Sequence, residues 1–230
     1  MNAPVKISRL VLPGCVLAFG LAVLPGAAWA DTVIYNNGAP DNFGTYYADA
    51  NNSFSFVASP FMLTAGSSTI TGATWWGGCS PEGTCPSGDF TIAFYSDDSG
   101  APGTLIQSYS VGSSNQTATG NSIGCGIGNC FTEYSYAASF GPLSLTPGTT
   151  YFFAVGDNTG ETDTWGQETA DAFANFDSHY ALSGGTWYGG YSTLAFELTS
   201  SGTVPEPSSI LLFGTMFLGM GAALKRRYPR

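Results

Sequence analysis

The sixteen Asp and Glu carboxylates are the first side chains of this sequence to consider for chemistry. A serine or cysteine nucleophile would need a neighbouring base, but the sequence holds a single histidine, His179, for which a structural role is the simpler interpretation. No GxSxG, HExxH or nucleotide-binding glycine loop is present. A glycoside hydrolase needs only two carboxylates at a set separation, and the candidates, most of them among turn residues, are Asp97, Asp98, Asp157, Glu161, Asp163 and Glu168. No pair of them is marked out by its spacing, and we therefore expect a protein that is not an enzyme.

The stretch from residue 157 to residue 163 suggests calcium binding. Asp157, Asn158, Glu161 and Asp163 offer hard oxygen ligands around a turn-forming glycine, as calcium prefers. The stretch lacks the spacing of an EF-hand loop and its final bidentate glutamate. A solvated hairpin tip is therefore the favoured interpretation, with calcium as the alternative and no other cofactor expected.

Five aromatic residues are candidates for binding carbohydrate, because flat aromatic faces stack on the C–H faces of sugar rings. They are Trp75, Trp76, Trp165, Trp187 and Tyr188. The alternative is core packing, to which aromatic side chains contribute strongly. Adjacent Trp75 and Trp76 would point to opposite faces of a sheet if both lie in a strand, so at least one of them is expected in the core.

Four cysteines follow residue 30, and we expect them to form disulfides. Cys79 and Cys85 make one pair close in sequence, and Cys125 and Cys130 make another. Both pairs lie in Gly-rich or Pro-rich stretches of a chain expected to be exported, where disulfides persist. Four cysteines allow three pairings, and the two local bridges are favoured over cross-pairing. A zinc site of four thiolates is disfavoured, since neither spacing is CxxC.

Charge is distributed unevenly along the chain. All six Lys and Arg residues lie near the two ends, while residues 31–203 hold fifteen of the sixteen acidic residues and no basic residue except His179. Such a domain cannot neutralise phosphates, which argues against nucleic-acid binding, and anionic lipid surfaces should repel it. Solubility of an exported protein is the favoured explanation of this acidity.

The elements expected to position these residues are β-strands. Apolar and aromatic residues recur at every second position in several short stretches, including Phe90–Tyr95, Tyr151–Val155 and Leu194–Leu198. No stretch between residues 31 and 203 has a convincing 3.6-residue period. The sequence therefore predicts a single all-β domain over residues 31–203, an antiparallel β-sandwich of jelly-roll-like form.

Turn-forming residues separate the expected strands. Gly, Pro, Asp and Asn gather at 97–103, 146–148 and 184–185, where glycine permits positive φ and proline presets φ. The first of these turns is expected to join a strand that ends at Tyr95 to one around Leu105–Val111.

Residues 1–30 have the composition of a secretory signal peptide. Two basic residues precede a long apolar stretch, and Ala28 and Ala30 supply the small residues of a cleavage site. This predicts export through the Sec translocon and cleavage by signal peptidase before Asp31. A lipoprotein signal ending at Cys15 is the alternative, which is disfavoured because the apolar stretch continues past that cysteine.

Residues 204–230 end the sequence with an apolar segment and a basic cluster. As a helix, Ile210–Leu224 would be about 22 Å long, shorter than the ~30 Å hydrocarbon core of a bilayer. Adding the two preceding serines and letting the basic side chains snorkel closes most of this gap. We therefore expect a transmembrane helix over residues 208–224 rather than a buried core helix. The positive-inside rule then places in the cytoplasm the basic cluster of Lys225, Arg226 and Arg227.

A Pro-Glu-Pro motif, one apolar segment and a basic cluster follow each other in this order at the end of the chain. This arrangement resembles the PEP-CTERM sorting signal of Gram-negative bacteria. The resemblance implies that the membrane protease exosortase recognises Pro205, Glu206 and Pro207 and removes the helix. It further implies an intermediate held in the inner membrane, followed by release to the cell surface or the extracellular matrix.

A second and looser resemblance covers the expected domain. It rests on the runs Ile70–Gly77, Phe90–Asp98, Gly100–Gly103, Leu145–Tyr151 and Leu194–Leu198, which look like the β-sandwich ectodomains of anchored bacterial surface proteins. Most such domains have no assigned function, so the resemblance implies a fold and a location but names no ligand.

These features together predict an exported, non-enzymatic surface or matrix protein. Its role would be structural or adhesive, linked to exopolysaccharide and biofilm. The alternatives are a carbohydrate-binding module that uses exposed Trp residues and a glycan-active hydrolase. If the tail is not a sorting signal, the chain would be a single-span membrane protein with an external β-domain.

Overall fold

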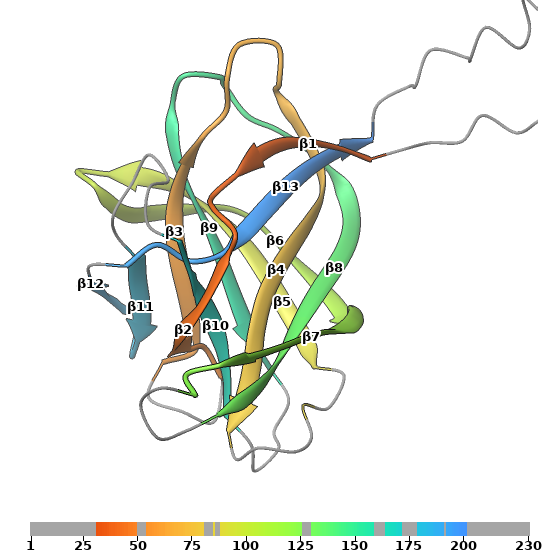
Figure 1. The fold of residues 1–230 in the computed structure, drawn as a ribbon. Helices are drawn as coiled ribbons and strands as arrows, with labels where there is room; N and C mark the ends of the chain where they lie inside the picture. The colour runs from red at the N-terminus through yellow and green to blue at the C-terminus, as the bar shows by residue number, and fades with distance from the viewer. Residues whose placement is uncertain are drawn as a thin grey trace, which may run out of the picture. The chain divides into compact units, whose positions relative to one another are not determined.

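Antiparallel pairs of strands make up the sheets of the computed structural model (Figure 1). The structure describes residues 31–49, 54–80, 85, 88–125, 130–158, 164–171, 179–190 and 192–201. All of these residues belong to one compact unit, Asp31–Gly202. The expected signal peptide and the whole 204–230 segment lie outside the described residues and stay predictions. No helix within the described ranges is long and apolar enough to cross a membrane.

The first sheet, here called sheet A, is built around its central strand, β4. Strands β13 and β10 pair with successive parts of β4, and β1 and β2 pair with their outer edges. Strand β8 pairs with the other edge of β4 and carries β7. The strands of sheet A are β1 (Asp31–Asn36), β2 (Pro40–Tyr47), β4 (Thr69–Ser80), β7 (Asn115–Ile123), β8 (Phe131–Ser144), β10 (Thr164–Ala170) and β13 (Phe196–Ser201).

The second sheet, sheet B, has the strand order β12-β11-β3-β9-β5-β6. Its strands are β3 (Phe56–Met62), β5 (Asp89–Asp98), β6 (Ala101–Ser113), β9 (Thr150–Asp157), β11 (His179–Ser183) and β12 (Thr186–Gly190). The two sheets enclose a shared apolar core, so the predicted all-β class and β-sandwich are confirmed. The jelly-roll-like form stays a prediction.

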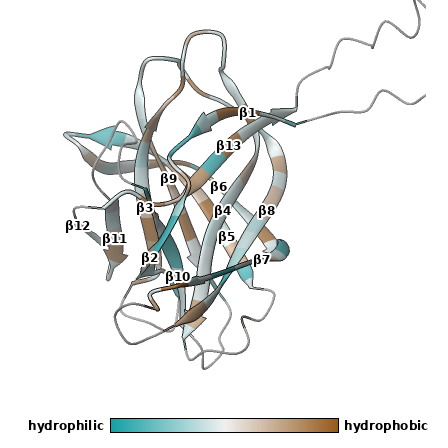
Figure 2. Cartoon of the chain, in the orientation of Figure 1, coloured by the Kyte–Doolittle hydropathy of each residue, from teal (hydrophilic) through white to brown (hydrophobic). Residues whose placement is uncertain are grey.

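The core follows the predicted alternation. Phe90, Ile92 and Phe94 of β5 are completely buried between the sheets, as are Phe196 and Leu198 of β13. Figure 2 shows the same alternation as bands of hydrophobic and polar colour along β8, whereas β7 is hydrophilic over most of its length. One-sided burial of this kind is what period-2 patterns specify, because successive side chains of a strand point to opposite faces.

Strand β9 departs from the expectation of one buried face. Phe153 and Val155 point into the core, but Phe152 and Ala154, on the opposite face, are buried as well. Aromatic rings of the β11–β12 hairpin and its neighbours cover this outer face of sheet B: the Phe152 and Tyr180 rings are 5.5 Å apart, and those of Tyr95 and Trp187 are 5.3 Å apart. The predicted one-sided pattern is therefore wrong for β9, because a second layer of side chains packs on its sheet.

The β5–β6 connection is tighter than the sequence predicts. Strand β5 continues to Asp98 and β6 begins at Ala101, and these two residues pair directly. Ser99 and Gly100 form a two-residue turn with φ values of 58° and 89°, as a type I′ hairpin requires. The strand boundaries at Tyr95 and Leu105 are thus corrected. Pro102 is tolerated inside β6 because this strand lies at the edge of the sheet.

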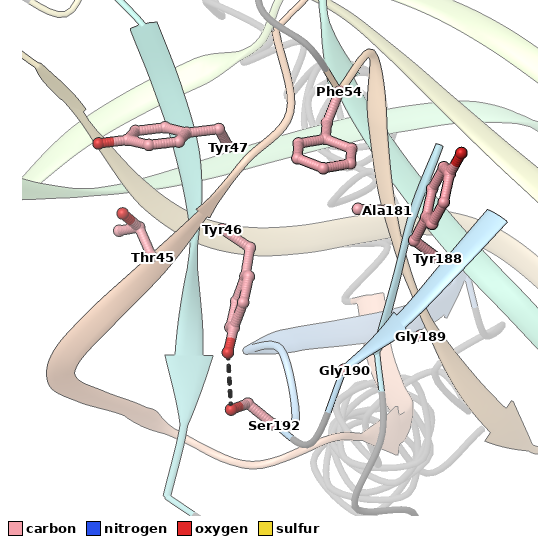
Figure 3. Close-up of a pocket in the computed structure, with 9 residues that line it drawn as sticks. All are labelled: Thr45, Tyr46, Tyr47, Phe54, Ala181, Tyr188, Gly189, Gly190 and Ser192. Carbon is pink, nitrogen blue, oxygen red and sulfur yellow. Dashed lines mark hydrogen bonds between the residues drawn. The ribbon is translucent and has the colours of Figure 1, made fainter. Parts of the chain in front are cut away.

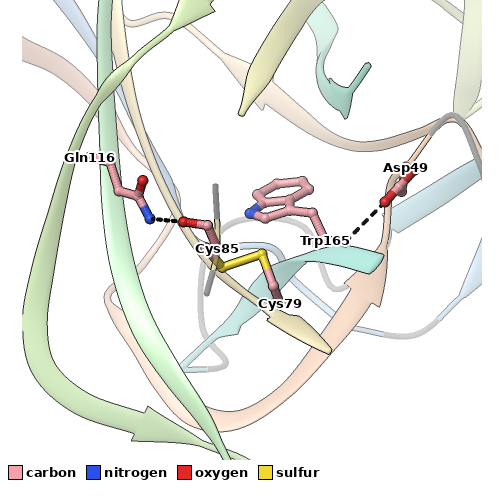
Figure 4. The surroundings of a disulfide bond; sticks show 5 residues. All are labelled: Asp49, Cys79, Cys85, Gln116 and Trp165. Carbon is pink, nitrogen blue, oxygen red and sulfur yellow. Dashed lines mark hydrogen bonds between the residues drawn. A yellow bond between two sulfur atoms is a disulfide. The ribbon is translucent and has the colours of Figure 1, made fainter. Parts of the chain in front are cut away.

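Both predicted local disulfides are present. Cys79 is bonded to Cys85 and Cys125 to Cys130, with Cα–Cα distances of 5.3 Å and 4.3 Å. The first bridge lies at the end of β4 beside the Trp165 ring, and Gln116 Nε2 donates a hydrogen bond of 3.4 Å to the Cys85 carbonyl (Figure 4). Disulfides are characteristic of oxidising compartments, so both bridges fit an extracellular protein.

Candidate functional site

A pocket of about 440 Å³ opens between β2 of sheet A and the β11–β12 hairpin of sheet B (Figure 3). Strand β2 is the last strand of sheet A and β12 the last strand of sheet B in the orders given above, so the pocket lies along an open edge of the sandwich. Its lining residues are Thr45, Tyr46, Tyr47, Phe54, Ala181, Tyr188, Gly189, Gly190 and Ser192.

Aromatic rings form much of the pocket wall. The rings of Phe54 and Tyr188 meet edge to face, with centroids 6.4 Å apart. Tyr188 is 56% exposed and offers most of its ring to solvent, whereas Phe54 is only partly exposed. Tyr46 reaches across from β2 and its hydroxyl lies 3.1 Å from Ser192 Oγ, while the Tyr47 ring points away from the other three rings. Three of the four rings therefore converge on one cavity.

The chemistry of the pocket is that of an uncharged binding site. Among the described residues, its polar side chains are hydroxyls, those of Thr45, Ser192 and the tyrosines, and none of the lining residues is Asp, Glu, Lys, Arg or His. Two successive glycines of β12, Gly189 and Gly190, line the pocket with backbone atoms alone. Ligand sites of similar size combine apolar walls with a few polar groups. Such a pocket could hold a sugar ring by stacking and by hydrogen bonds to hydroxyls.

The structure separates the five predicted glycan-binding aromatic residues. Trp75 and Trp165 are 0% and 1% exposed and pack in the core, so the prediction is wrong for both because no face is free for a ligand. Trp76 is partly buried in β4, and Trp187 is partly buried against Tyr95. Tyr188 is the member of this group that lines the pocket.

The predicted calcium ligands are described only in part. Asp157 is buried at the end of β9, and Asn158 Nδ2 donates a 2.6 Å hydrogen bond to Thr91 Oγ1. Glu161 and Asp163 lie outside the described residues. Within the described ranges no group of three Asp, Glu, His or Cys side chains could hold a metal ion. Calcium binding by this stretch stays a prediction.

The other predicted functional residues have different places in the chain. His179 is the first residue of β11 and pairs with Gly190 of β12. The signal-cleavage residues Ala28 and Ala30 lie outside the described residues. So do the sorting motif Pro205–Pro207 and the basic cluster 225–227.

Sequence reasoning missed three aromatic residues of the pocket, Tyr46, Tyr47 and Phe54. The pair Tyr46-Tyr47 resembles Trp75-Trp76 as two adjacent rings that a strand points to opposite faces, and this signal could have drawn attention to it. No local pattern indicates that Tyr46 faces Ser192, because that contact depends on which strands lie at the edges of the two sheets.

Comparison with known proteins gives little further information. No protein-family model matches this chain, and no curated protein matches it. One solved structure that it resembles contains the cysteine protease and lectin-like domains of Cwp84, a surface layer associated protein of Clostridium difficile, with a TM-score of 0.40 and 14% sequence identity. The match covers 63% of this chain and 31% of that chain, so the chain spans about a third of that protein's length. This distant likeness adds nothing to the fold described above.

Proposed function

We propose that this chain is an exported, non-enzymatic protein of the cell surface or extracellular matrix, with an adhesive domain that binds neutral polysaccharide. The observation that carries the binding part is the uncharged, aromatic-walled pocket between β2 and β12. The two disulfides and the composition of residues 1–30 support export.

The charge of the domain favours a neutral ligand. Residues 31–203 carry fifteen acidic residues and no Lys or Arg, so an anionic polysaccharide would meet repulsion and no cationic partner. A neutral sugar would not be repelled by the carboxylates of the domain. Its C–H faces could stack on the exposed ring of Tyr188. The pocket differs from the site first expected, which was an exposed Trp.

Replacement of Tyr188 by alanine should weaken retention on neutral polysaccharide about tenfold. The loss corresponds to roughly 1–2 kcal/mol of ring contact. Affinity electrophoresis in gels containing neutral exopolysaccharide from the producing organism measures the change, with a uronic-acid polysaccharide as the anionic comparison. Tyr188→Phe keeps the ring and should retain most of the binding.

A matched control is Leu105→Ala. Leu105 is 49% exposed on β6, at the opposite end of sheet B from β12, so its removal should leave retention unchanged. Circular dichroism should show that all variants keep their strands. Unchanged retention by Tyr188→Ala, or an equal loss in Leu105→Ala, would contradict a binding site at the pocket.

We further propose that the C-terminal segment is a PEP-CTERM sorting signal, with exosortase as the processing partner. The order of Pro205-Glu206-Pro207, an apolar segment and a basic cluster supports this proposal. The protein recovered from the surface fraction should then have an intact mass that begins at Asp31 and ends near Pro207, with or without an added group. A mass that extends through Arg230 would instead mean a permanent anchor and would rule out sorting by exosortase.

A further inference from the structure

Two glutamates are buried side by side on the outer face of sheet A. Glu133 of β8 is 1% exposed and Glu168 of β10 is 0% exposed. Side chains alternate along a strand, and Tyr136 of β8 and Trp165 of β10 both point into the core. Glu133 and Glu168 therefore point to the opposite face, and neither takes part in the aromatic pocket.

A bulge of β2 covers this pair. Four residues, Asp41–Gly44, stand opposite the single residue Thr169 of β10, because the pairing passes from Thr45 with Glu168 to Pro40 with Ala170. We call this segment the β2 bulge. Asn42 adopts a left-handed backbone with φ of 59°, which is unfavourable for a residue with a side chain. Such a conformation persists where surrounding contacts hold it.

The contacts that hold the β2 bulge lead to the two glutamates. The Asn42 backbone N–H donates a 2.7 Å hydrogen bond to Glu168 Oε1, and the Gly124 N–H donates one of 3.0 Å to the Asn42 carbonyl. Asn121 Nδ2, in β7, donates a 3.4 Å hydrogen bond to Glu133 Oε1. One oxygen of each carboxyl group is thus used by the segments that close over the pair.

The second oxygen of each carboxyl group is buried, and no described residue donates a hydrogen bond to it. Glu133 Oε2 and Glu168 Oε2 have no partner among the described residues, although the two carboxyl groups lie within hydrogen-bonding reach of each other. Two ionised carboxylates in this position would repel each other and lose their hydration. The domain has no Lys or Arg that could compensate.

We propose that Glu133 and Glu168 share one proton, which bridges their free oxygens and fastens the β2 bulge to sheet A. A single O–H···O hydrogen bond satisfies both orphaned oxygens and removes the repulsion between the two groups. Carboxyl pairs that share one proton for this reason are known in proteins. A divalent cation is the less suitable occupant, because calcium takes six to eight oxygen ligands and this site has two free ones.

Among the described residues, few other ionisable groups face the pair. Asp41 of the β2 bulge is near Glu168 and adds to the repulsion, but its Oδ1 already accepts hydrogen bonds from Thr169 Oγ1 and the Phe43 N–H. Strand β7, Asn115–Ile123, contains no ionisable residue, and the single thiol of β4, that of Cys79, is in a disulfide. Within the described residues, Asp41 is therefore the additional carboxylate near the pair.

The expected pH dependence has a definite sign. Burial is the main cause that raises the pKa of Glu168 from 4.5 to about 8, followed by the nearby Glu133, while the hydrogen bond from Asn42 lowers it. The folded state therefore holds a proton that the unfolded chain releases near pH 4.5. The stabilisation is fully present below pH 4.5 and is lost as the pH rises toward and through 8.

The test compares denaturant unfolding of the full chain from pH 5 to pH 9 in wild type, Glu168→Gln and Glu133→Gln. In the wild type, loss of this proton should raise the unfolding equilibrium constant about tenfold per pH unit up to pH 8. Glutamine carries its own N–H donors at every pH, so both variants should lack this component and should be the more stable proteins at pH 9. Asp98→Asn is the matched control, because Asp98 is an exposed carboxylate at the end of β5, in the other sheet, and it should follow the wild type.

Two further measurements keep the proposal open to contradiction if a variant folds poorly. Carboxyl ¹³C NMR of the wild type should show one proton shared by Glu133 and Glu168 at pH 6–7, and amide exchange of Asn42 and Gly124 at pH 9 should be faster in the wild type than in Glu168→Gln. Identical pH profiles in wild type and Glu168→Gln, or two ionised carboxylates at pH 6, would overturn the proposal. A wild-type profile that becomes flat on adding calcium chloride would identify a cation as the occupant instead.

Discussion

Replacing Trp75 by alanine is expected to lower the free energy of unfolding by about 3–5 kcal/mol, the usual cost of deleting a buried Trp or Phe side chain. The indole is completely buried, and its ring centroid lies 5.3 Å from that of Phe90 and 5.9 Å from that of Tyr136. These rings come from β4, β5 and β8, which belong to both sheets, so no single strand can move to fill the cavity. Urea unfolding at neutral pH measures the loss.

The neighbouring residue supplies the control. Trp76→Ala removes the same side chain from the next position of β4, where the indole is only partly buried, and should cost clearly less. Trp75→Phe should recover part of the stability, because it keeps a ring and removes Nε1, a buried donor without a hydrogen-bond partner among the described residues. Equal losses in Trp75→Ala and Trp76→Ala would contradict the placement of Trp75 in the core.

Gly77→Ala is expected to destabilise the domain by about 1–3 kcal/mol through overpacking. A Cβ atom at Gly77 would collide with the Gly166 carbonyl oxygen and would lie 2.8 Å from Cζ2 of Trp165. Neither neighbour can move easily, since one is the backbone of β10 and the other is a ring packed 4.9 Å from Phe90. The shift of the denaturation midpoint, at unchanged slope, measures the effect.

Gly141→Ala is the matched control for this substitution. A Cβ atom there would lie 3.8 Å from Cε1 of Tyr109, an ordinary contact on an exposed part of β8. Its stability should stay within about 0.5 kcal/mol of the wild type, as for most surface changes. If Gly77→Ala were as stable as Gly141→Ala, β10 and Trp165 would have to lie farther from β4 than the structure places them.

The strands of the core were predictable because their cause is local. Phe90, Ile92 and Phe94 alternate with more polar residues, and this period places all three in the core whatever the sheet order is. The turn around Gly100 was located for a similar reason. Its tight form, however, depends on a positive φ at Ser99, which the residue type alone does not predict. The local disulfides followed from short spacings in a chain expected to be exported.

The candidate sites were less predictable because they depend on contacts between distant segments. Trp75 and Trp76 have identical side chains, and the side of β4 that faces the second sheet decides which of them is buried. Tyr46 and Ser192 meet only because β2 and β12 lie at the same open edge of the sandwich. Glu168 was named for its type, but its pairing with Glu133 follows from β10 and β8 flanking β4.

The sequence by itself determined the all-β class, the alternation of buried residues, the two disulfides and a domain without basic residues. These properties depend on backbone geometry and on composition over a few residues. Both can be read from short stretches of the sequence. Only the tertiary structure decided the strand order, the aromatic pocket and the buried pair Glu133–Glu168. Each of these arises where strands far apart in sequence are placed side by side, and such placement depends on the free energy of the whole sandwich rather than on any local pattern.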